Sequence, residues 1–412
     1  MKRKNYWFLF AILLLSLTSL SPSFEFTKNV GNESPGNDPI PPSQTPDIPE
    51  SDLGPIQVAV QLEGKELHKL KQMNKEFMDQ TGAVVEILPL DSIGSNEELF
   101  IQKMNLGEGP DVLLVDSQWI KSLAIKGYLL PIDASQAAPD SQLFGGLLPP
   151  VQWNGYQWGI PFDMDPYVLA LSMTEEQLEL PANREEWVDY KKNHGDNPVF
   201  ALDPEDPYTF ASAVYTLGGD PEQPDKEVLS MLAPPIGDSW LNLTDTGSMI
   251  LKSEDSDESA GASIAIGAYS SLSKDLPEGY ELMLVGSHSD EQKPVVRSRS
   301  YAVTAQSESS SLAMAWISEM TSKDAEREWT EFTGKLTVLS NVQNFSVSDI
   351  NYTQIKPDIA GRVSTLLERG EAIRLNFGRD DGFMDYFVSV VDLLYGRITI
   401  EDFTEHYEVV SQ

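Results

Sequence analysis

Residues 109–133, GPDVLLVDSQWIKSLAIKGYLLPID, decide the fold, because they join a short buried strand directly to a polar and aromatic turn. Residues 112–115 form an apolar run that is too short for a core helix and is bounded by polar turns, which predicts a central strand. A helix is expected over residues 118–126, ending at Gly127, since glycine suits the left-handed position after a helix. Ligands of open α/β sheets bind beyond the carboxyl ends of the strands, so residues 116–119 are expected to face a cleft.

The preceding segment repeats the alternation of strand and helix. Residues 56–62 alternate apolar and polar side chains with the period of a strand. The next apolar residues recur at three- and four-residue intervals up to Phe77, which predicts a helix that ends at Gly82. Residues 83–87 resume an extended apolar pattern. This alternation predicts an α/β fold with right-handed crossovers, a mostly parallel sheet and helices on both faces.

Length, charge and cysteine content limit the classes of function. A chain of 412 residues is expected to form more than one compact unit. Its formal net charge of -35 repels phosphate backbones, so nucleic acid is not an expected partner. The sequence contains no cysteine, which excludes disulfides, thiolate metal sites, cysteine nucleophiles and a lipid anchor on cysteine.

The N-terminus has the pattern of an export signal. Residues 1–23 combine a positive start, an apolar run over 6–20 and small residues for cleavage, which predicts a signal peptide or, if it is retained, an N-terminal anchor. Residues 24–55 are rich in proline and polar side chains and are expected to form a disordered linker. The mature protein is therefore expected outside the cytoplasm, secreted, periplasmic or tethered to the outer face of the plasma membrane.

Beyond residue 133 the motifs follow a specific order. Asn154-Gly155 is a strong two-residue turn signal between aromatic residues, and it leads into GIPFDMD at residues 159–165 and a strand expected over 167–171. The later motifs are Asp206-Pro207-Tyr208, Gly-Gly at 218–219, ASIAIGAY at 262–269, a strand at 301–305 followed by a helix at 312–320, and YGRITIED at 395–402. This ordered series resembles the extracellular solute-binding proteins, in particular the sugar-binding group that includes maltose-binding protein.

The resemblance implies a two-lobed α/β fold in which the chain crosses a hinge more than once and closes over a ligand in the cleft between the lobes. The first lobe is expected over residues 56–164 and 295–345, and the second over residues 165–294 and 346–412. Carried over residue by residue, it places ligand contacts at Asp116, Gln118, Trp119, Asp165, Asp206, Tyr208, Tyr269 and Phe383. The neighbouring Asp163 is included as a further acid that can converge on the cleft.

These residue types suit carbohydrate chemistry. Aromatic rings can cover the apolar face of a sugar, and ionised carboxylates can accept hydrogen bonds from its hydroxyl groups. Gln118 and Trp119 stand where maltose-binding relatives often have an acid and an arginine, so maltose itself is not implied.

Enzymatic interpretations find no support in the motifs. The four histidines lie far apart and form neither a metal-binding nor a catalytic signature, no phosphate-binding loop is present, and the acidic run at 254–258 lacks the calcium-loop pattern. We therefore expect no catalytic residues, no cofactor and no metal. The expected function is the capture of a small solute, a sugar or oligosaccharide, by a monomer that delivers it to the membrane permease of an ABC importer. The alternatives are a membrane-tethered sensor or structural module without a transporter, and a protein that binds a polyamine or cation.

Overall fold

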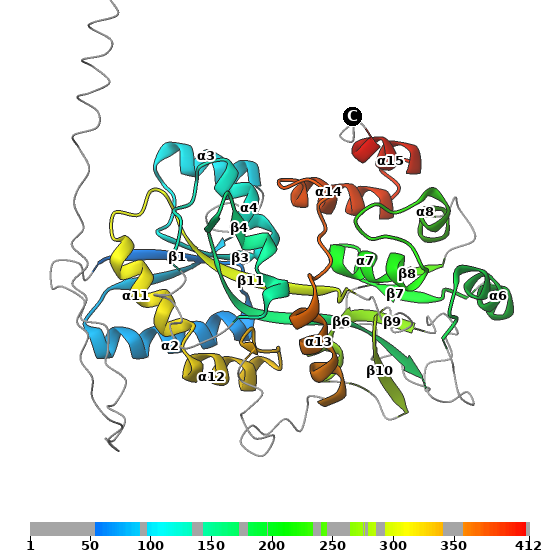
Figure 1. Cartoon of the computed structure of the whole chain (residues 1–412), viewed down its shortest axis with the longest axis horizontal. Helices are drawn as coiled ribbons and strands as arrows, with labels where there is room; N and C mark the ends of the chain where they lie inside the picture. Colours follow the sequence, from blue (N-terminus) through cyan, green and yellow to red (C-terminus); the bar gives the residue numbers. More distant parts are fainter. Residues whose placement is uncertain are drawn as a thin grey trace, which may run out of the picture. The chain divides into compact units, whose positions relative to one another are not determined.

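The computed structural model (Figure 1) describes residues 54–90, 97–133, 143–172, 180–195, 197–233, 240–244, 264–274, 276, 279–285, 293–340 and 357–408. These residues belong to the compact unit Pro46–Gln412. The predicted signal segment 1–23 and all but the last two residues of the predicted linker 24–55 lie outside the described residues. No helix in the described ranges is long and apolar enough to cross a membrane.

A nine-stranded sheet organises the described residues, in the order β2-β1-β3-β11-β6-β9-β7-β8, with β10 also paired to β6 (Figure 1). Its strands are β1 (Ile56–Val60), β2 (Val85–Pro89), β3 (Val112–Asp116), β6 (Ile160–Ser172), β7 (Phe200–Leu202), β8 (Leu241–Leu243), β9 (Ile264–Ala268), β10 (Tyr280–Leu284) and β11 (Val296–Val303). β3 is buried along its whole length, which confirms the central strand predicted from the apolar run at 112–115.

The prediction of a mostly parallel sheet is correct at its two ends and wrong in its middle. β1 pairs in parallel with β2 and β3, and β7 pairs in parallel with β8 and β9. β6 and β11 are antiparallel to each other and to their other neighbours. The physical reason is the path of the chain: β6 leads from the half with β3 toward the half with β9, and β11 returns, so the two strands run in opposite directions.

Twelve helices accompany the sheet in the described residues. They are α2 (Gly64–Thr81), α3 (Glu97–Leu106), α4 (Ser117–Ile125), α6 (Arg184–His194), α7 (Pro207–Thr216), α8 (Lys226–Leu232), α10 (Tyr269–Leu272), α11 (Ser310–Met320), α12 (Lys323–Thr333), α13 (Pro357–Arg369), α14 (Phe383–Leu394) and α15 (Ile400–Glu408). The predicted helices that end at Gly82 and that span 118–126 and 312–320 correspond to α2, α4 and α11. α2 ends at Gly82, which has the left-handed φ of 75° that favours glycine. Asn154 and Gly155 both have positive φ and join the short strands β4 (Gln152–Trp153) and β5 (Tyr156–Gln157), as the turn signal predicted.

Three hydrophobic clusters hold these elements together. One packs α2, α11 and α12 against β1, β2 and β3, and Trp316 and Trp329 are its largest buried residues. A second packs α13 against β6 and β9. The third cluster packs β3, α4, α7 and α14 together. It therefore holds the first residues of α4 and α14, Ser117 and Phe383, close to the first turn of α7. This third cluster positions the candidate site.

Candidate functional site

Three cavities meet near the middle of the sheet, and Arg297 of β11 lines all of them. The first, of about 330 Å³, is called here the aromatic cavity, and its rings are those of Trp119, Tyr208, Phe383 and Phe387. The second, of about 590 Å³, is called the basic cavity, and its cationic side chains are Lys65, Arg297, Arg299 and Lys335. The third, of about 180 Å³, is called the acidic cavity, and its carboxylates are Glu66, Asp163, Asp165 and Asp206.

Asp116, Gln118 and Tyr208 form a hydrogen-bonded network on the wall of the aromatic cavity. Asp116 ends β3 and caps α4 by accepting a hydrogen bond from the backbone N–H of Gln118 at 3.0 Å. The Tyr208 hydroxyl donates toward both carboxylate oxygens of Asp116, 3.0 Å away, and accepts from Gln118 Nε2 at 2.9 Å. Gln118 Oε1 accepts from the backbone N–H of Leu375 at 2.6 Å. Both the nitrogen and the oxygen of the Gln118 side-chain amide are therefore hydrogen-bonded within the protein, and Gln118 lines none of the three cavities.

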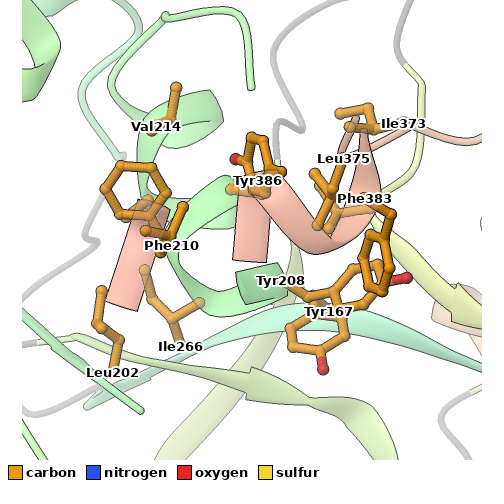
Figure 2. Packing of buried hydrophobic residues seen from close by; sticks show 14 of the residues in the cluster. Tyr167, Leu202, Tyr208, Phe210, Val214, Ile266, Ile373, Leu375, Phe383 and Tyr386 are labelled. Carbon is orange, nitrogen blue, oxygen red and sulfur yellow. The ribbon is translucent and has the colours of Figure 1, made fainter. Parts of the chain in front are cut away.

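The aromatic rings of this region come from five separate segments. Tyr167 and Tyr208 stack with their ring centroids 5.3 Å apart, and Phe383 lies 6.4 Å from Tyr208; Figure 2 shows the three residues side by side at one edge of the packed cluster. Trp119 packs on Phe100 at 6.2 Å. Trp119 is only 6% exposed, so it contributes an edge of its ring to the cavity and the rest to the core.

Asp206 connects the aromatic and acidic cavities. It caps α7 by accepting a hydrogen bond from the backbone N–H of Tyr208 at 3.0 Å, and it also accepts from the Tyr167 hydroxyl at 2.5 Å. Burial raises the pKa values of both Asp116 and Asp206, although the charge of Arg297 acts in the opposite direction. Both carboxyl groups face space that a ligand could fill.

β6 and β11 place four charged residues on one face of the sheet. Asp163 lies opposite Arg299 and Asp165 lies opposite Arg297, and residues two apart on a strand point the same way. Asp163 accepts hydrogen bonds from Arg299 Nε at 3.0 Å, from Arg299 Nη2, and from Trp329 Nε1 at 2.9 Å. Burial opposes ionisation of Asp163, but Arg299 and Lys335 outweigh it and hold its pKa well below the usual range. Asp163 is therefore committed to an internal ion pair.

Asp165 has a different environment from its neighbour. It accepts hydrogen bonds from the backbone N–H of Ser270 at 3.0 Å and from the Ser270 hydroxyl at 2.5 Å, and it lines the acidic cavity. Burial raises the pKa of Asp165 to about 6, and Lys335 and Ser270 moderate that rise. Asp165 thus carries a carboxyl group that changes its charge near neutral pH while it faces the cavity.

Tyr269 lies away from the three cavities. It is the first residue of α10 and is fully buried in the cluster that packs α13 against β6. Tyr269 therefore has a packing role in the structure. The other expected residues line the cavities, except Gln118, which is hydrogen-bonded to the wall residue Tyr208.

Several charged residues that line the cavities were not predicted from the sequence, among them Glu66, Arg297, Arg299 and Lys335. Glu66 of α2 pairs with Arg299 at 2.9 Å and with Lys335 at 2.5 Å. One signal could have revealed the two arginines. RSRS at 297–300 lies within a strand, so its period of two puts both cations on one face, which is unusual in a chain with only 29 basic residues. In the described part of the chain, no three potential ligands gather in a way that could hold a metal ion.

Comparisons with known proteins agree with this geometry. A family model described as "Bacterial extracellular solute-binding protein" matches residues 72–356, which is more than half of the chain. No curated protein matches the sequence.

Solved structures share the fold at low sequence identity. An ABC transporter solute-binding protein from Thermotoga lettingae, bound with alpha-D-tagatose, is 16% identical with a TM-score of 0.62 over 85% of this chain and 97% of that one. The GacH receptor of Streptomyces glaucescens, studied unliganded and with acarbose, is 16% identical with a TM-score of 0.63 over 86% and 97%. The maltose-maltodextrin binding protein of Alicyclobacillus acidocaldarius is 12% identical with a TM-score of 0.58 over 86% and 98%. These likenesses confirm the predicted α/β fold of the two-lobed binding-protein type.

Proposed function

Because the chain belongs to the bacterial extracellular solute-binding protein family, we propose that it captures a sugar or oligosaccharide and delivers it to the membrane permease of an ABC importer. Family membership makes the chain a binding protein that works outside the cytoplasm, as the sequence predicted. The solute class and the permease are our proposal, and they agree with the alpha-D-tagatose and acarbose that the structural relatives bind.

The aromatic cavity is the observation that carries the proposal. Its aromatic residues form an apolar wall that can contact the C–H groups of a sugar, and Asp116 and Asp206 on the same wall offer acceptors for hydroxyl groups. Hydrogen bonds to charged groups contribute about 1.5–3 kcal/mol each, while micromolar binding needs only about 8 kcal/mol in total. Two such contacts combined with ring stacking are therefore sufficient for a specific sugar site.

We propose that hinge closure traps the solute between two lobes, residues 56–164 with 295–345 and residues 165–294 with 346–412. β6 and β11 would serve as the crossing strands, since they connect the two halves of the sheet. In this scheme the hydrogen bond from Tyr208 to Asp116 joins the second lobe to the first, so it would form on closure and hold the closed state. The protein is expected to act as a monomer.

The alternatives receive less support from the site. A polyamine would be repelled in the basic cavity by Arg297, Arg299 and Lys335, whereas the four acids of the aromatic cavity would attract it, so the calorimetric comparison with spermidine decides this alternative. The predicted signal at 1–23 leaves two forms open, a released protein and one tethered by the retained segment. N-terminal sequencing of the mature protein distinguishes them.

A binding screen tests the proposed function. We expect isothermal titration calorimetry with a panel of mono- and oligosaccharides to find at least one ligand with micromolar or tighter affinity. Spermidine and calcium chloride serve as the comparison ligands, and we expect neither to bind. Binding of spermidine or calcium, with no heat from any carbohydrate, would overturn the sugar assignment.

The pH dependence of binding tests Asp165. An ionised carboxylate accepts hydrogen bonds from sugar hydroxyls, and with a pKa of about 6 the group is mostly protonated at pH 5. We expect affinity to fall by up to about tenfold from pH 7 to pH 5. Asp165→Asn is expected to weaken binding at pH 7 by about 1–3 kcal/mol and to reduce that pH dependence. The pKa values of Asp116 and Asp206 are also raised, so part of the slope remains.

The raised pKa of Asp165 affects stability in the opposite direction from ligand affinity: as pH rises, we expect the affinity to increase and the free energy of unfolding to decrease. Between about pH 4 and pH 6 the folded protein keeps a proton that the unfolded chain loses, so this group lowers the free energy of unfolding as pH rises through that window. Asp189→Asn, a change on the exposed surface of α6, is the matched control for both measurements. Equal pH profiles for Asp165→Asn and the unsubstituted protein would exclude Asp165 from the ligand site.

A further inference from the structure

We infer that the solute carries an anionic group, a carboxylate, phosphate or sulfate, and that the guanidinium of Arg297 binds it; this inference rests on the proposed function. The solute is then an acidic sugar or sugar derivative. Its neutral part would occupy the aromatic cavity, and its anionic group would lie at Arg297, where that cavity meets the basic cavity.

Arg297 differs from Arg299 in what its guanidinium contacts. Arg299 is almost fully buried, and its nitrogens bind Asp163, Glu66 and the backbone oxygen of Gln61. Arg297 keeps 36% of its side-chain surface exposed, and its Nε lies 3.3 Å from Asp116 Oδ2. No described residue accepts a hydrogen bond from that Nε. That Nε is itself buried, and the charge of Asp116 holds the guanidinium in place, so a ligand can contact Arg297 through the part of its side chain that remains exposed.

The basic cavity has a charge balance opposite to that of the whole chain. Lys65, Arg297, Arg299 and Lys335 line it together with two acids, Glu63 and Glu66, which leaves a formal excess of positive charge. The chain as a whole carries -35. Charges screen one another over about 8 Å at physiological ionic strength, so the charge of the distant surface acts only weakly in the cavity. Asp163 and Asp116 lie close to Arg299 and Arg297 and balance part of the positive charge, but four cationic side chains line one cavity of a very acidic protein, as a site for an anionic ligand requires.

The N-terminus of α2 adds to this positive potential. The helix begins at Gly64, and the preceding Glu63 does not cap it with its side chain. Both flanking residues, Glu63 and Lys65, line the basic cavity. The positive end of the helix dipole therefore lies beside the cationic side chains of this cavity.

The aromatic cavity supplies the complementary half of the site. Four acids, Asp116, Asp203, Glu205 and Asp206, and a single cation, Arg297, line it. These acids accept hydrogen bonds from hydroxyl groups but repel an anion. A ligand with a hydroxyl-rich ring and one anionic group therefore fits in a single orientation, with the ring among the aromatic residues and the anion at Arg297. Guanidinium binds carboxylate and phosphate through two parallel hydrogen bonds, which makes arginine suited to this contact.

Ligand pairs that differ only in charge test the inference. The pairs are glucose with glucuronate, glucose with glucose 6-phosphate, and 4-linked galactobiose with digalacturonate, each titrated into the protein by calorimetry. Inorganic phosphate is a separate ligand. We expect at least one acidic member to bind about tenfold or more tightly than its neutral partner.

Variants at Arg297 assign the preference to this residue. We expect Arg297→Gln to weaken binding of the acidic ligand by about 10- to 100-fold and to weaken binding of its neutral partner by a clearly smaller factor, so that the preference for the acidic member is lost. Arg297→Lys keeps the charge but not the paired donors, so it should retain part of the preference. Arg327→Gln is the matched control, because that arginine lies on the exposed side of α12 with Asp324. Thermal unfolding of each variant verifies that it folds.

The possible results separate this inference from the proposed function. If neutral sugars bind as tightly as their acidic partners, or if Arg297→Gln keeps the acidic preference, the inference is wrong and the sugar-binding proposal stands. If inorganic phosphate binds with the same dependence on Arg297 and no sugar binds, the anion site stands and the sugar proposal fails. If no ligand of the set binds, both fail.

Discussion

Asp163→Asn is expected to lower the free energy of unfolding by about 3–5 kcal/mol, because it removes one partner of a buried ion pair. Asp163 is 2% exposed and accepts hydrogen bonds from Arg299 and Trp329. In the variant, Glu66 is the remaining carboxylate partner of the buried Arg299 guanidinium. Glu66 also pairs with Lys335, so a single carboxylate then faces two cations. Urea unfolding at pH 7 measures the loss.

A double variant distinguishes the loss of one charged partner from a change in packing. Asp163→Leu with Arg299→Met removes both partners and leaves the pair of Glu66 and Lys335 intact, so we expect it to recover part of the stability, because apolar replacement of a buried pair is often neutral or stabilising. The recovery is incomplete because Trp329 Nε1 loses its acceptor. Asp324→Asn, at an exposed pair on α12, serves as the control and should change stability by less than about 0.5 kcal/mol. A loss below about 1 kcal/mol for Asp163→Asn would argue against this structural role.

The lowered pKa of Asp163 gives the same ion pair a defined pH dependence. The folded protein holds this carboxylate ionised to lower pH than the unfolded chain does, so its contribution to stability is present above about pH 4. The contribution is lost as pH falls further below that value. Acid unfolding of the double variant should therefore begin at lower pH than that of the unsubstituted protein.

Trp119→Ala is expected to reduce both stability and affinity. The ring is 6% exposed and packs on Phe100, so its removal leaves a cavity in the core and should cost about 3–5 kcal/mol of unfolding free energy. Its edge also lines the aromatic cavity, and truncation of an aromatic anchor typically weakens binding by about 2 kcal/mol or more. Urea unfolding and calorimetry with the best ligand of the carbohydrate panel measure the two effects.

Trp119→Phe distinguishes the two roles. Phenylalanine retains much of the buried ring but lacks the indole N–H, which is buried without a hydrogen-bond acceptor among the described residues. Because Trp119 lines the aromatic cavity, we expect a ligand oxygen to be the acceptor for this donor. We therefore expect Trp119→Phe to keep most of the stability and to lose part of the affinity. Unchanged affinity in both variants would remove Trp119 from the site.

Local patterns were sufficient to predict the elements around the site. The apolar run at 112–115 became β3, and the left-handed glycine at 82 ends α2 where the periodicity stops. Asn154-Gly155 forms the expected two-residue connection between β4 and β5. These features depend on side-chain spacing and backbone freedom over a few residues, so a single sequence contains the information.

The ordered motifs also predicted the family, whose model matches residues 72–356. They placed five expected ligand contacts, Asp116, Trp119, Asp206, Tyr208 and Phe383, on segments that the structure brings to one cavity. Contact with a ligand remains a prediction for each of them.

The sequence by itself determined the strands and helices around Gly82 and Asp116 and the kind of protein to which the chain belongs, one that works outside the cytoplasm. Only the tertiary structure decided which carboxylates are free to meet a ligand. Asp163 and Asp165 are equivalent in the sequence, yet one is neutralised by Arg299, 136 residues away, and the other faces a cavity beside Ser270. The reason is physical: periodicity is a property of neighbouring residues, whereas charge pairing and burial depend on which distant strands lie side by side. β6 and β11 are those strands here, and their antiparallel register brings Arg297 and Arg299 into the site.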